Sequence, residues 1–336
     1  MTRKVHMKLK GRKVLVTGAD GFIGSHLVER CVREGAGVRA FVYYNSFNTW
    51  GWLDTLPAAV LKKIEVVAGD VRDQGCVHTA CRGVDVVFHL AALISIPYSY
   101  QAPESYVATN INGTVNILQA ARLQGVRKVI HTSTSEVYGT AQKVPIGEDH
   151  PLNPQSPYAA SKSAADSFAV SFYRSFDLPV AVLRPFNTFG PRQSARAVIP
   201  TIISQILARK KTIRLGNLEA TRDLNYVGNT VEAFMRLAQV DQGLGEVYNT
   251  GSGVEVSVRE VVGIIQHILR SKVRVEVDPA RIRPAKSEVE RLVCDARKLT
   301  ALTGWSPGIP LEQGLRATCA WVKEHLNHFK TDIYNV

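Results

Sequence analysis

The sequence predicts an α/β protein with a Rossmann-type, doubly wound parallel sheet and a smaller, interleaved C-terminal substrate lobe. Short apolar runs alternate with amphipathic stretches through the first half of the chain, as in a parallel sheet covered by helices on both faces. A glycine-rich turn, GADGFIG at 18–24, joins the first apolar run to the first amphipathic stretch. From residue 184 onward prolines and arginines interrupt this alternation, and the 336 residues exceed one typical core.

Strands are expected where β-branched and other apolar residues run without interruption, because a strand buried on both faces shows no polar alternation. This pattern predicts strands at 13–18, 37–43, 64–70, 85–92, 126–135 and 178–187.

Helices are expected where apolar residues recur with the helical period between start and stop signals. Gly35 closes the first of these stretches, and Ser156 with Pro157 forms the N-cap and first turn of a later one. The pattern predicts helices at 22–35, 104–125, 156–176 and 226–240.

The domain boundaries follow from where the alternation stops and resumes. Residues 1–183 are expected to form a dinucleotide-binding domain, to which 225–254 return. Residues 184–224 and 255–330 are expected to form the substrate lobe.

Composition narrows the classes of protein. No run approaches the roughly 18 apolar residues of a membrane span, and the basic N-terminus lacks the apolar core of a secretory signal. The net charge of +12 lacks any accompanying nucleic-acid-binding motif, so no nucleic acid is expected as a partner. No metal-ligand spacing is present. The cysteines form no Cys-x-x-Cys pair, which predicts reduced thiols and a cytoplasmic location: Cys31, Cys76, Cys81, Cys294 and Cys319.

The glycine turn predicts a dinucleotide site. Glycines allow the backbone to approach a pyrophosphate, and the N-terminus of the following helix supplies amides and the positive end of its dipole. The motif lies after the first strand and opens a helix, which is the context that such a site requires.

The acidic residue that often follows the second strand and binds the ribose is absent, since Val42, Tyr43 and Tyr44 stand there. No arginine replaces it, so the choice between NAD and NADP stays open. Asp70, after the third strand, is either near the adenine or a turn residue. The aromatic residues around this segment are expected to pack in the core or to form a lid near the adenine: Tyr43, Tyr44, Phe47, Trp50 and Trp52.

Tyr158 and Lys162 are spaced i, i+4, so they share one face of the helix at 156–176. An ammonium group beside a phenol favours the phenolate and lowers the tyrosine pKa. Tyr158 is therefore a candidate general base for an alcohol. His89, at the end of the fourth strand, is expected to be a packed strand histidine.

The motifs together resemble the extended short-chain dehydrogenase/reductase family. The resemblance rests on TGADGFIG, HLAA, STSEVYG, YAASK, LRPFNTFGPRQ and GWSPGIPLEQGLRAT, which occur in this order over almost the whole chain. Within that family the sequence resembles nucleotide-sugar 4,6-dehydratases. The segments FVYYNSFNTWGWLD, IPTIISQIL and RPAKSEVERL are similar to the legionaminic-acid-pathway type, which acts on a nucleotide-linked N-acetylglucosamine.

The resemblance implies a reaction sequence for Tyr158, Lys162, Thr134 and Glu136. Tyr158, poised by Lys162 and helped by Thr134, takes the proton of the sugar 4-hydroxyl while C4 is oxidised by the nicotinamide. Glu136 removes the C5 proton, water leaves from C6, and hydride returns to C6. The product is a 4-keto-6-deoxy sugar.

Ser135 departs from the glucose-type dehydratases, which carry Asp-Glu where this chain carries Ser-Glu. A serine is a poor proton donor. Glu136 is therefore expected to accept the C5 proton and then to donate it to the leaving hydroxyl, as the Thr-Ser-Glu motif of the mannose-type dehydratases implies.

The resemblance also implies the residues that hold the cofactor and the substrate. The cofactor is NAD, with NADP open, bound tightly and regenerated in each turnover. Its contacts are Tyr158 and Lys162 together with Gly18, Gly21, Phe22, Ile23, Gly24, Asp70, Val71, Leu90, Ala91 and Ala92. A UDP- or GDP-linked sugar is expected to contact Ser95, Asn187, Arg192, Arg222 and Arg283, and arginine suits its diphosphate because the guanidinium binds phosphate bidentately.

Three other functions remain open at this stage. A 4-epimerase uses the same cofactor and Tyr-Lys pair but needs no carboxylate at 136. A uronate decarboxylase also carries Ser-Glu-Val-Tyr-Gly, but its family has an arginine near the tyrosine that QSPYAASK lacks. The third is a non-catalytic protein that binds a dinucleotide and uses its basic surface on RNA.

The family also implies a homodimer in which the helices at 104–125 and 156–176 form a four-helix bundle.

Overall fold

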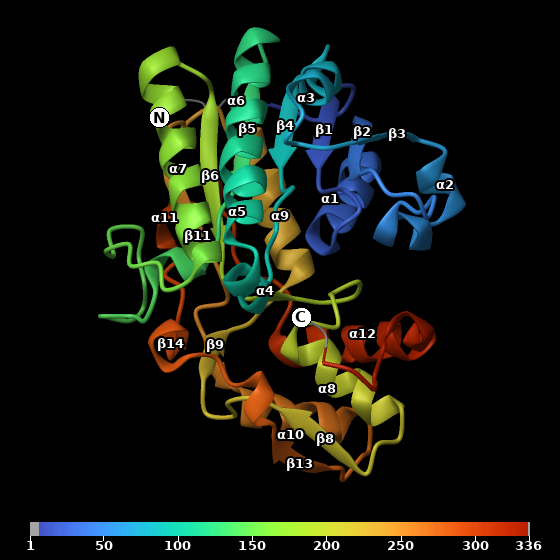
Figure 1. The fold of residues 1–336 in the computed structure, drawn as a ribbon. Helices are drawn as coiled ribbons and strands as arrows, with labels where there is room; N and C mark the ends of the chain where they lie inside the picture. Colours follow the sequence, from blue (N-terminus) through green and yellow to red (C-terminus); the bar gives the residue numbers. More distant parts are fainter. Residues whose placement is uncertain (1–6, 335–336) are drawn as a thin grey trace.

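The computed structural model describes residues 7–334. In Figure 1 a parallel sheet with its covering helices forms the larger lobe, and α8, α10 and α12 with β8 and β13 form a smaller lobe beneath it. The strands are β1 (Lys13–Thr17), β2 (Gly37–Tyr43), β3 (Ile64–Gly69), β4 (Val86–His89), β5 (Lys128–Thr132), β6 (Val180–Pro185), β7 (Thr188–Phe189), β8 (Thr212–Leu215), β9 (Thr221–Asp223), β10 (Asn225–Tyr226), β11 (Val247–Thr250), β12 (Glu255–Ser257), β13 (Arg274–Val277) and β14 (Arg291–Leu292).

The helices include several short ones. The α-helices are α1 (Phe22–Arg33), α2 (Ala58–Leu61), α3 (Gln74–Cys81), α4 (Ile96–Gln101), α5 (Pro103–Tyr106), α6 (Gly113–Leu123), α7 (Pro157–Phe176), α8 (Val198–Leu207), α9 (Val227–Gln239), α10 (Val258–Ile268), α11 (Arg297–Thr303) and α12 (Leu311–Glu324). The 3-10 helices are η1 (Gly51–Thr55), η3 (Ser135–Tyr138), η4 (Pro279–Arg281), η5 (Ala285–Ser287) and η6 (Leu326–His328), and η2 (Val107–Asn112) is a π-helix.

The main sheet has seven parallel strands in the order β11-β6-β5-β4-β1-β2-β3. Chain order reverses between β1 and β4, and this switch point is where open α/β sheets bind ligands. The predicted Rossmann-type fold is confirmed.

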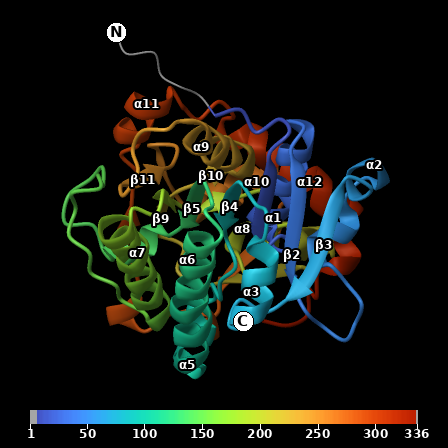
Figure 2. The ribbon, with the colours of Figure 1, turned by 90° about the horizontal axis from the view of Figure 1, so that it is seen from above.

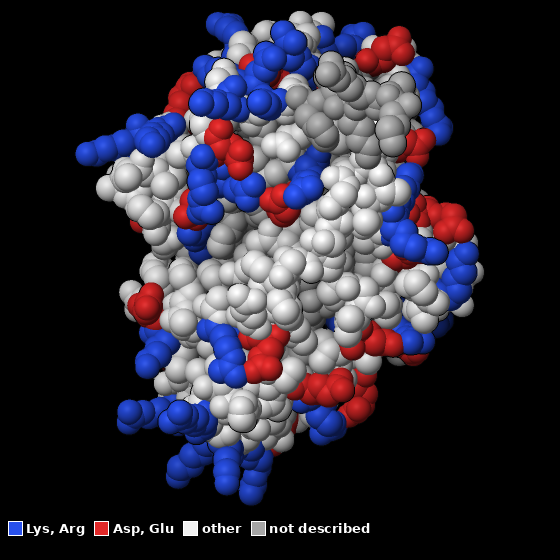
Figure 3. Space-filling model, turned by 180° about the vertical axis from the view of Figure 1, so that it is seen from behind, with Lys and Arg blue, Asp and Glu red and all other residues white. Residues whose placement is uncertain are grey.

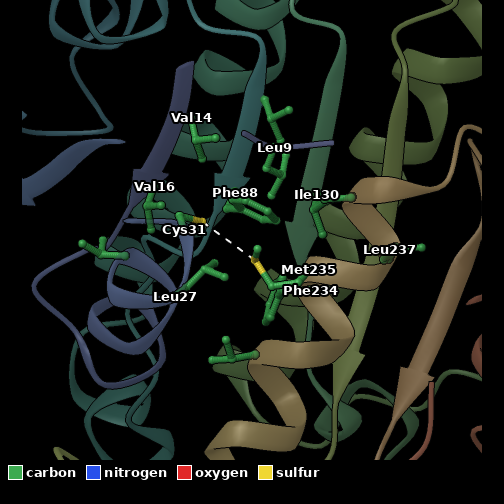
Figure 4. Close-up of a cluster of buried hydrophobic side chains, with 14 of the residues drawn as sticks. Leu9, Val14, Val16, Leu27, Cys31, Phe88, Ile130, Phe234, Met235 and Leu237 are labelled. Atoms are coloured by element: carbon green, nitrogen blue, oxygen red, sulfur yellow. Dashed lines mark hydrogen bonds between the residues drawn. The ribbon is translucent and has the colours of Figure 1, made fainter. Parts of the chain in front are cut away.

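Successive residues of each strand pack on opposite faces of the sheet. Val14 and Val16 of β1 join a cluster with α1, α9 and Trp305, whereas Leu15 joins a cluster with α3, α6 and α7. Figure 2 shows these helices on the two sides of the sheet, and Figure 4 shows Phe88, Cys31 and Met235 meeting in the first cluster. Both faces are thus covered, which explains the uninterrupted apolar strands.

The smaller lobe has a core of its own. Side chains of α8, α10, α12 and β8 form one buried cluster, in which Phe189 of β7 and Leu224, between β9 and β10, also take part. The parallel strands β8 and β13 form a two-stranded sheet in this lobe. A separate small sheet has three strands in the order β12-β9-β14. No helix within residues 7–334 has the length and apolar character that a membrane crossing needs.

The structure differs from what the sequence predicts in two places. The helix expected at 104–125 is divided into α5, the π-helix η2 and α6. Leu299 and Trp305, expected in the substrate lobe, pack in the core of the sheet lobe because α11 lies against α9 and β11. The division into two domains itself stays a prediction.

The aromatic group after β2 was expected to pack in the core or to form a lid near the adenine. Core packing is wrong for most of the group, and the lid stays a prediction. Tyr43, Tyr44, Phe47 and Trp50 are exposed, with Phe47 exposed by 86%. Trp52 instead packs edge-on against Trp321 of α12, with 5.2 Å between ring centroids. The loop projects from the end of β2, so its rings have no layer above them.

Replacement of Phe88 by alanine should destabilise the protein strongly. Phe88 is fully buried and meets Phe234 edge-to-face at 6.2 Å between ring centroids. Loss of a buried phenyl ring costs about 3–5 kcal/mol of unfolding free energy, measurable by urea denaturation. The exposed Phe47→Ala is the matched control and should stay within about 0.5 kcal/mol of the parent. Equal effects of the two substitutions would contradict this assignment of the core.

Candidate active site

The candidate site lies along the edge where the parallel strands end. The glycine loop follows β1, Leu90 and Ala91 follow β4, and Thr134 to Glu136 follow β5. Asn187 follows β6. Because β1, β4, β5 and β6 are neighbouring and parallel, these segments meet at one edge.

Thr134 fixes the carboxylate at the end of β5. Its backbone is extended, and its side-chain oxygen accepts a hydrogen bond from the backbone N–H of Glu136 at 3.3 Å, which starts η3. Thr134, Ser135 and Glu136 are all buried. The strand therefore ends in a short helical turn that holds a carboxylate away from bulk water.

Tyr158 and Lys162 lie in the first two turns of α7. Ser156 accepts a hydrogen bond from the backbone N–H of Ala159 at 3.1 Å, and Pro157 is the first helical residue, as the sequence predicts. Tyr158 and Lys162 are both more than nine-tenths buried. The Tyr158 ring meets Tyr106 edge-on at 6.3 Å.

Burial dominates the electrostatics of this pair. Burial raises the pKa of Tyr158, and hydrogen bonding with Thr134 opposes that rise while the negative charge of Glu136 adds to it. Glu136 is thus close enough to act on the phenol through its charge. Burial also lowers the pKa of Lys162 to about 8, opposed by Asp166.

The expectation that Lys162 lowers the pKa of Tyr158 is wrong for this structure. The pKa of the phenol is raised, because the loss of hydration disfavours the phenolate. Burial also lowers the pKa of Lys162, because it disfavours the charged ammonium group.

A buried network beneath α7 was missed from the sequence. Asp166 accepts hydrogen bonds from the Ser133 hydroxyl at 2.6 Å and from Arg184 Nε at 3.0 Å, and it lies 3.3 Å from Nε2 of His131. Arg184 also donates to the Tyr138 hydroxyl at 2.9 Å. A charged residue within the apolar run VAVLRPF is the sequence signal for such a buried partner.

Asn110 is a second residue that sequence reasoning missed. Its side chain accepts from the backbone N–H of Leu93 at 2.8 Å and donates to the Ser161 hydroxyl at 2.9 Å. It lies in the π-helix, a distortion frequently found at functional sites. Asn110 therefore connects the loop after β4 to α7. His89, as expected, is packed, with Nδ1 2.8 Å from the Thr17 hydroxyl and Nε2 3.0 Å from that of Thr114.

The glycine loop fits a dinucleotide pyrophosphate. Gly18 has a positive φ of 67°, and an added Cβ would lie 2.9 Å from the backbone nitrogen of Ala91. An added Cβ at Gly24 would lie 2.1 Å from the carbonyl oxygen of Gly18. Gly21 is the N-cap of α1, and no side chain within residues 7–334 accepts from the amides of Phe22 or Ile23. These amides can therefore bind an anion.

The other residues expected at the cofactor have structural partners. Asp70 is held by Arg72 through its guanidinium and its backbone N–H. The carbonyl of Val71 accepts from Asn116 at 2.9 Å. The backbone N–H groups of Leu90 and Ala91 both donate to the Thr17 hydroxyl at 3.1 Å, and Ala92 follows them. Cofactor contacts at these positions stay predictions.

Arg222 and Arg283 are brought together by Glu288. Arg222 donates to that carboxylate at 3.0 Å and to the carbonyl of Thr221 at 2.9 Å. Nη1 of Arg283 lies 3.7 Å from Glu288 and, within residues 7–334, has no hydrogen-bond partner. Two guanidinium groups around one carboxylate leave a net positive charge suited to a diphosphate.

The other three residues expected to contact the substrate differ in whether their polar atoms have partners. The amide oxygen of Asn187 is buried without a hydrogen-bond partner in the described part of the chain. Arg192 pairs with Glu29 of α1 at 3.0 Å, while its Nε and Nη1 lack partners there. The Ser95 hydroxyl caps α4 by accepting from the backbone N–H of Tyr98 at 3.4 Å. Whether these three contact a substrate stays a prediction.

The charged surface shows no single basic face on the side seen in Figure 3. Lys and Arg side chains gather at its two ends with acidic residues among them, and a largely uncharged band lies between. Within residues 7–334 no group of three or more His, Cys, Asp or Glu side chains is arranged to hold a metal.

Comparison with known proteins gives consistent matches. A family model described as GDP-mannose 4,6 dehydratase matches residues 15–318. A UDP-glucose 4-epimerase of Mycolicibacterium smegmatis is 36% identical over 312 residues, which is 91% of this chain and 97% of that protein. The dTDP-D-glucose 4,6-dehydratase of Homo sapiens is 31% identical over 336 residues, covering 95% of this chain and 92% of the relative.

A solved structure matches the whole fold. The dTDP-glucose 4,6-dehydratase DesIV of Streptomyces venezuelae, with NAD and TYD bound, aligns with a TM-score of 0.82 at 30% identity. The alignment covers 95% of this chain and 99% of DesIV.

The fold and the Tyr-Lys pair at the end of its sheet define an enzyme of the extended short-chain dehydrogenase/reductase class. The chain belongs to the GDP-mannose 4,6-dehydratase family of that class, whose matching relatives are nucleotide-sugar dehydratases and epimerases.

Replacement of Arg283 by glutamine should weaken the binding of a nucleoside diphosphate. A hydrogen bond between charged groups contributes about 1.5–3 kcal/mol, so the dissociation constant should rise about 10- to 100-fold. Calorimetric titration with UDP, GDP and dTDP measures this change. Arg281→Gln is the control, because Arg281 is occupied by Asp278 at 3.2 Å and by the Tyr334 ring. Unchanged affinity in Arg283→Gln would remove this residue from the site.

Proposed function

We propose that the protein is a nucleotide-sugar 4,6-dehydratase that converts a nucleoside-diphosphate hexose, specifically a linked N-acetylglucosamine, into the 4-keto-6-deoxy sugar. The observation that carries this proposal is the buried Glu136 beside Tyr158. Elimination of water across C5 and C6 needs a base for the C5 proton, whereas C4 epimerisation does not. The substrate's N-acetyl group is supported only by the similarity of three sequence segments.

The roles of the side chains follow from their positions. Tyr158, as its phenolate, removes the proton of the 4-hydroxyl, and the hydrogen bond with Thr134 opposes the rise in pKa that burial causes. Glu136 takes the proton from C5, which the 4-ketone acidifies. Glu136 then returns the proton to the departing C6 hydroxyl, because Ser135 is a poor acid. A bound nicotinamide dinucleotide would supply the oxidation at C4 and the matching reduction at C6. C5 would regain a proton that comes from solvent, and Tyr158 would release the 4-hydroxyl proton to solvent.

NAD is the proposed cofactor, retained tightly through the cycle. DesIV holds NAD, and the amides at the N-terminus of α1 together with Gly18 and Gly24 suit its pyrophosphate. Lys162, whose pKa is about 8, would donate to the ribose beside the nicotinamide in its protonated form. Tight retention is expected because the same dinucleotide is reoxidised in each turnover.

A 4-epimerase is the second candidate. The observation in its favour is the 36% identity to an epimerase, above the 31% identity to the human dehydratase. Both activities begin with the same removal of the 4-hydroxyl proton by Tyr158. They differ in whether the C5 proton is then removed.

A homodimer through α6 and α7 is part of the proposal. Exposed apolar side chains lie on these helices and on the π-helix before α6: Val107, Leu123, Phe168 and Phe176. Such residues are expected at a helix–helix interface. Light scattering after size-exclusion chromatography should give twice the mass of one chain, and a monomeric mass would contradict the bundle.

Replacement of Glu136 by glutamine should separate oxidation from elimination. Glutamine keeps the size of the side chain but cannot accept the C5 proton, and a positioned general base contributes about 10²–10⁴-fold to the rate. Dehydration of the nucleotide sugar should fall by about that factor, while absorbance of the reduced nicotinamide still develops. Incorporation of solvent deuterium at C5 should be lost in parallel.

The exposed Glu104→Gln, at the start of α5, is the control for expression and folding. Unaltered dehydration in Glu136→Gln would remove Glu136 from the mechanism. Inversion at C4 without water loss, in both the parent and the variant, would favour the epimerase.

A further inference from the structure

The end of β2 lacks the acidic residue that usually binds the adenosine ribose in this fold. Tyr43 ends the strand and Tyr44 follows it, and both side chains are exposed. In Rossmann folds a carboxylate at this place accepts hydrogen bonds from the ribose hydroxyls of NAD, and it disfavours the 2′-phosphate of NADP. The structure therefore raises the question of which group performs that selection here.

A carboxylate does reach this place, from the glycine loop itself. Asp20 lies between Gly18 and Gly21, and its Oδ2 accepts a hydrogen bond from the backbone N–H of Tyr43 at 3.3 Å. Its side chain is partly buried between the glycine loop and the end of β2. The carboxylate thus lies at the end of the strand where the missing acid would stand.

The backbone of Asp20 is held in place by the loop after β2. Its carbonyl accepts from the backbone N–H of Trp52 at 3.0 Å. Gly51 has a positive φ of 59°, and an added Cβ there would lie 2.6 Å from that same carbonyl oxygen. Only glycine allows this close approach, and Trp52 is in turn packed against Trp321. The position of the carboxylate is therefore fixed from both sides.

The arginine that contacts Tyr43 is paired with a carboxylate. Arg72 donates to both carboxylate oxygens of Asp70, at 3.0 and 2.9 Å through Nε, and its Nη2 lies 3.4 Å from the Tyr43 hydroxyl. A 2′-phosphate would need a free guanidinium here. Asp70 occupies that guanidinium.

We propose that Asp20 is the residue that selects NAD over NADP, by accepting hydrogen bonds from the adenosine ribose at the position left vacant after β2. Asp70 assists by engaging Arg72, which otherwise would attract the 2′-phosphate. The inference rests on the proposed function only in that the glycine loop binds a nicotinamide dinucleotide. In this proposal Asp20 determines which dinucleotide binds and takes no part in the reaction on the sugar.

Asp20→Asn isolates the charge, because the asparagine amide oxygen can still accept from the N–H of Tyr43 and preserve the loop. Dissociation constants of NAD and NADP would be measured by calorimetry after removal of any retained dinucleotide. The parent should bind NAD at least about 100-fold more tightly than NADP, since NADP loses the ribose contact and meets a like charge. In Asp20→Asn that ratio should fall by about 10-fold or more.

Asp70→Asn provides the second arm of the test. It should free Arg72 and increase the affinity for NADP several-fold, so the ratio of the two affinities should fall. Asp149→Asn, on an exposed loop, is the control for a general change in charge and should leave the ratio unaltered.

Two outcomes would overturn the inference. An unchanged ratio in Asp20→Asn would show that the carboxylate only holds the loop, and equal affinities of the parent for both cofactors would show that no selection occurs. If neither dinucleotide binds the parent, the proposed function fails together with the inference. Selective binding of NAD by a parent that does not dehydrate any sugar would leave this inference standing while the proposed reaction fails.

Discussion

The buried carboxylate of Asp166 is the constraint on which the active site depends. It lies in the middle of α7, where its Oδ2 accepts hydrogen bonds from Ser133 just beyond β5 and from Arg184 of β6, and its Oδ1 lies 3.3 Å from His131 of β5. An unpaired charge at this depth would destabilise the protein by several kcal/mol. This cost favours the one position of α7 on the sheet in which Asp166 is paired. That position places Lys162 and Tyr158, one and two turns earlier in the same helix, opposite Thr134 and Glu136.

Burial then sets the chemistry of the groups so placed. The same loss of hydration raises the pKa of Tyr158 and lowers that of Lys162 to about 8, so each group is moved toward its neutral form. Removal of a proton from an alcohol needs the phenolate form of Tyr158, which the hydrogen bond with Thr134 favours against the effect of burial. Glu136, acting on this phenol through its charge, adds a second proton acceptor a short distance away. The pair and the carboxylate therefore form one unit, held by contacts that reach from β5 to β6.

Features that depend on neighbouring residues could be predicted from the sequence. The apolar runs predicted the strands of the parallel sheet up to β6, and Ser156 with Pro157 predicted the start of α7. The glycine spacing predicted the turn before α1, since Gly18 and Gly24 are required by contacts within the loop and with the segment after β4. The resemblance of the motifs placed the chain in the correct family.

Features that depend on contacts between distant segments could not be predicted. Asp166 and Arg184 are separated along the chain, and so are Arg222 and Glu288. The residues that flank each of them in the sequence do not indicate which partner it contacts. Asp20 reaches the end of β2 only because Gly51 and Trp52 hold its backbone. Core packing was one of two expectations for the aromatic loop after β2, beside a lid near the adenine, because composition does not reveal whether a layer of structure lies above a segment. The pKa of Tyr158 was mistaken for the same reason, since the depth of burial is a property of the folded chain.

The most direct measurement follows the hydrogen at C4 of the sugar. The enzyme would be incubated with nucleotide-linked N-acetylglucosamine carrying deuterium at C4, and the product would be analysed by mass spectrometry and NMR. The account predicts a product lighter by one water, with a ketone at C4 and the deuterium in the new methyl group at C6. A product of unchanged mass, with the deuterium still at C4 and the configuration there inverted, would contradict it.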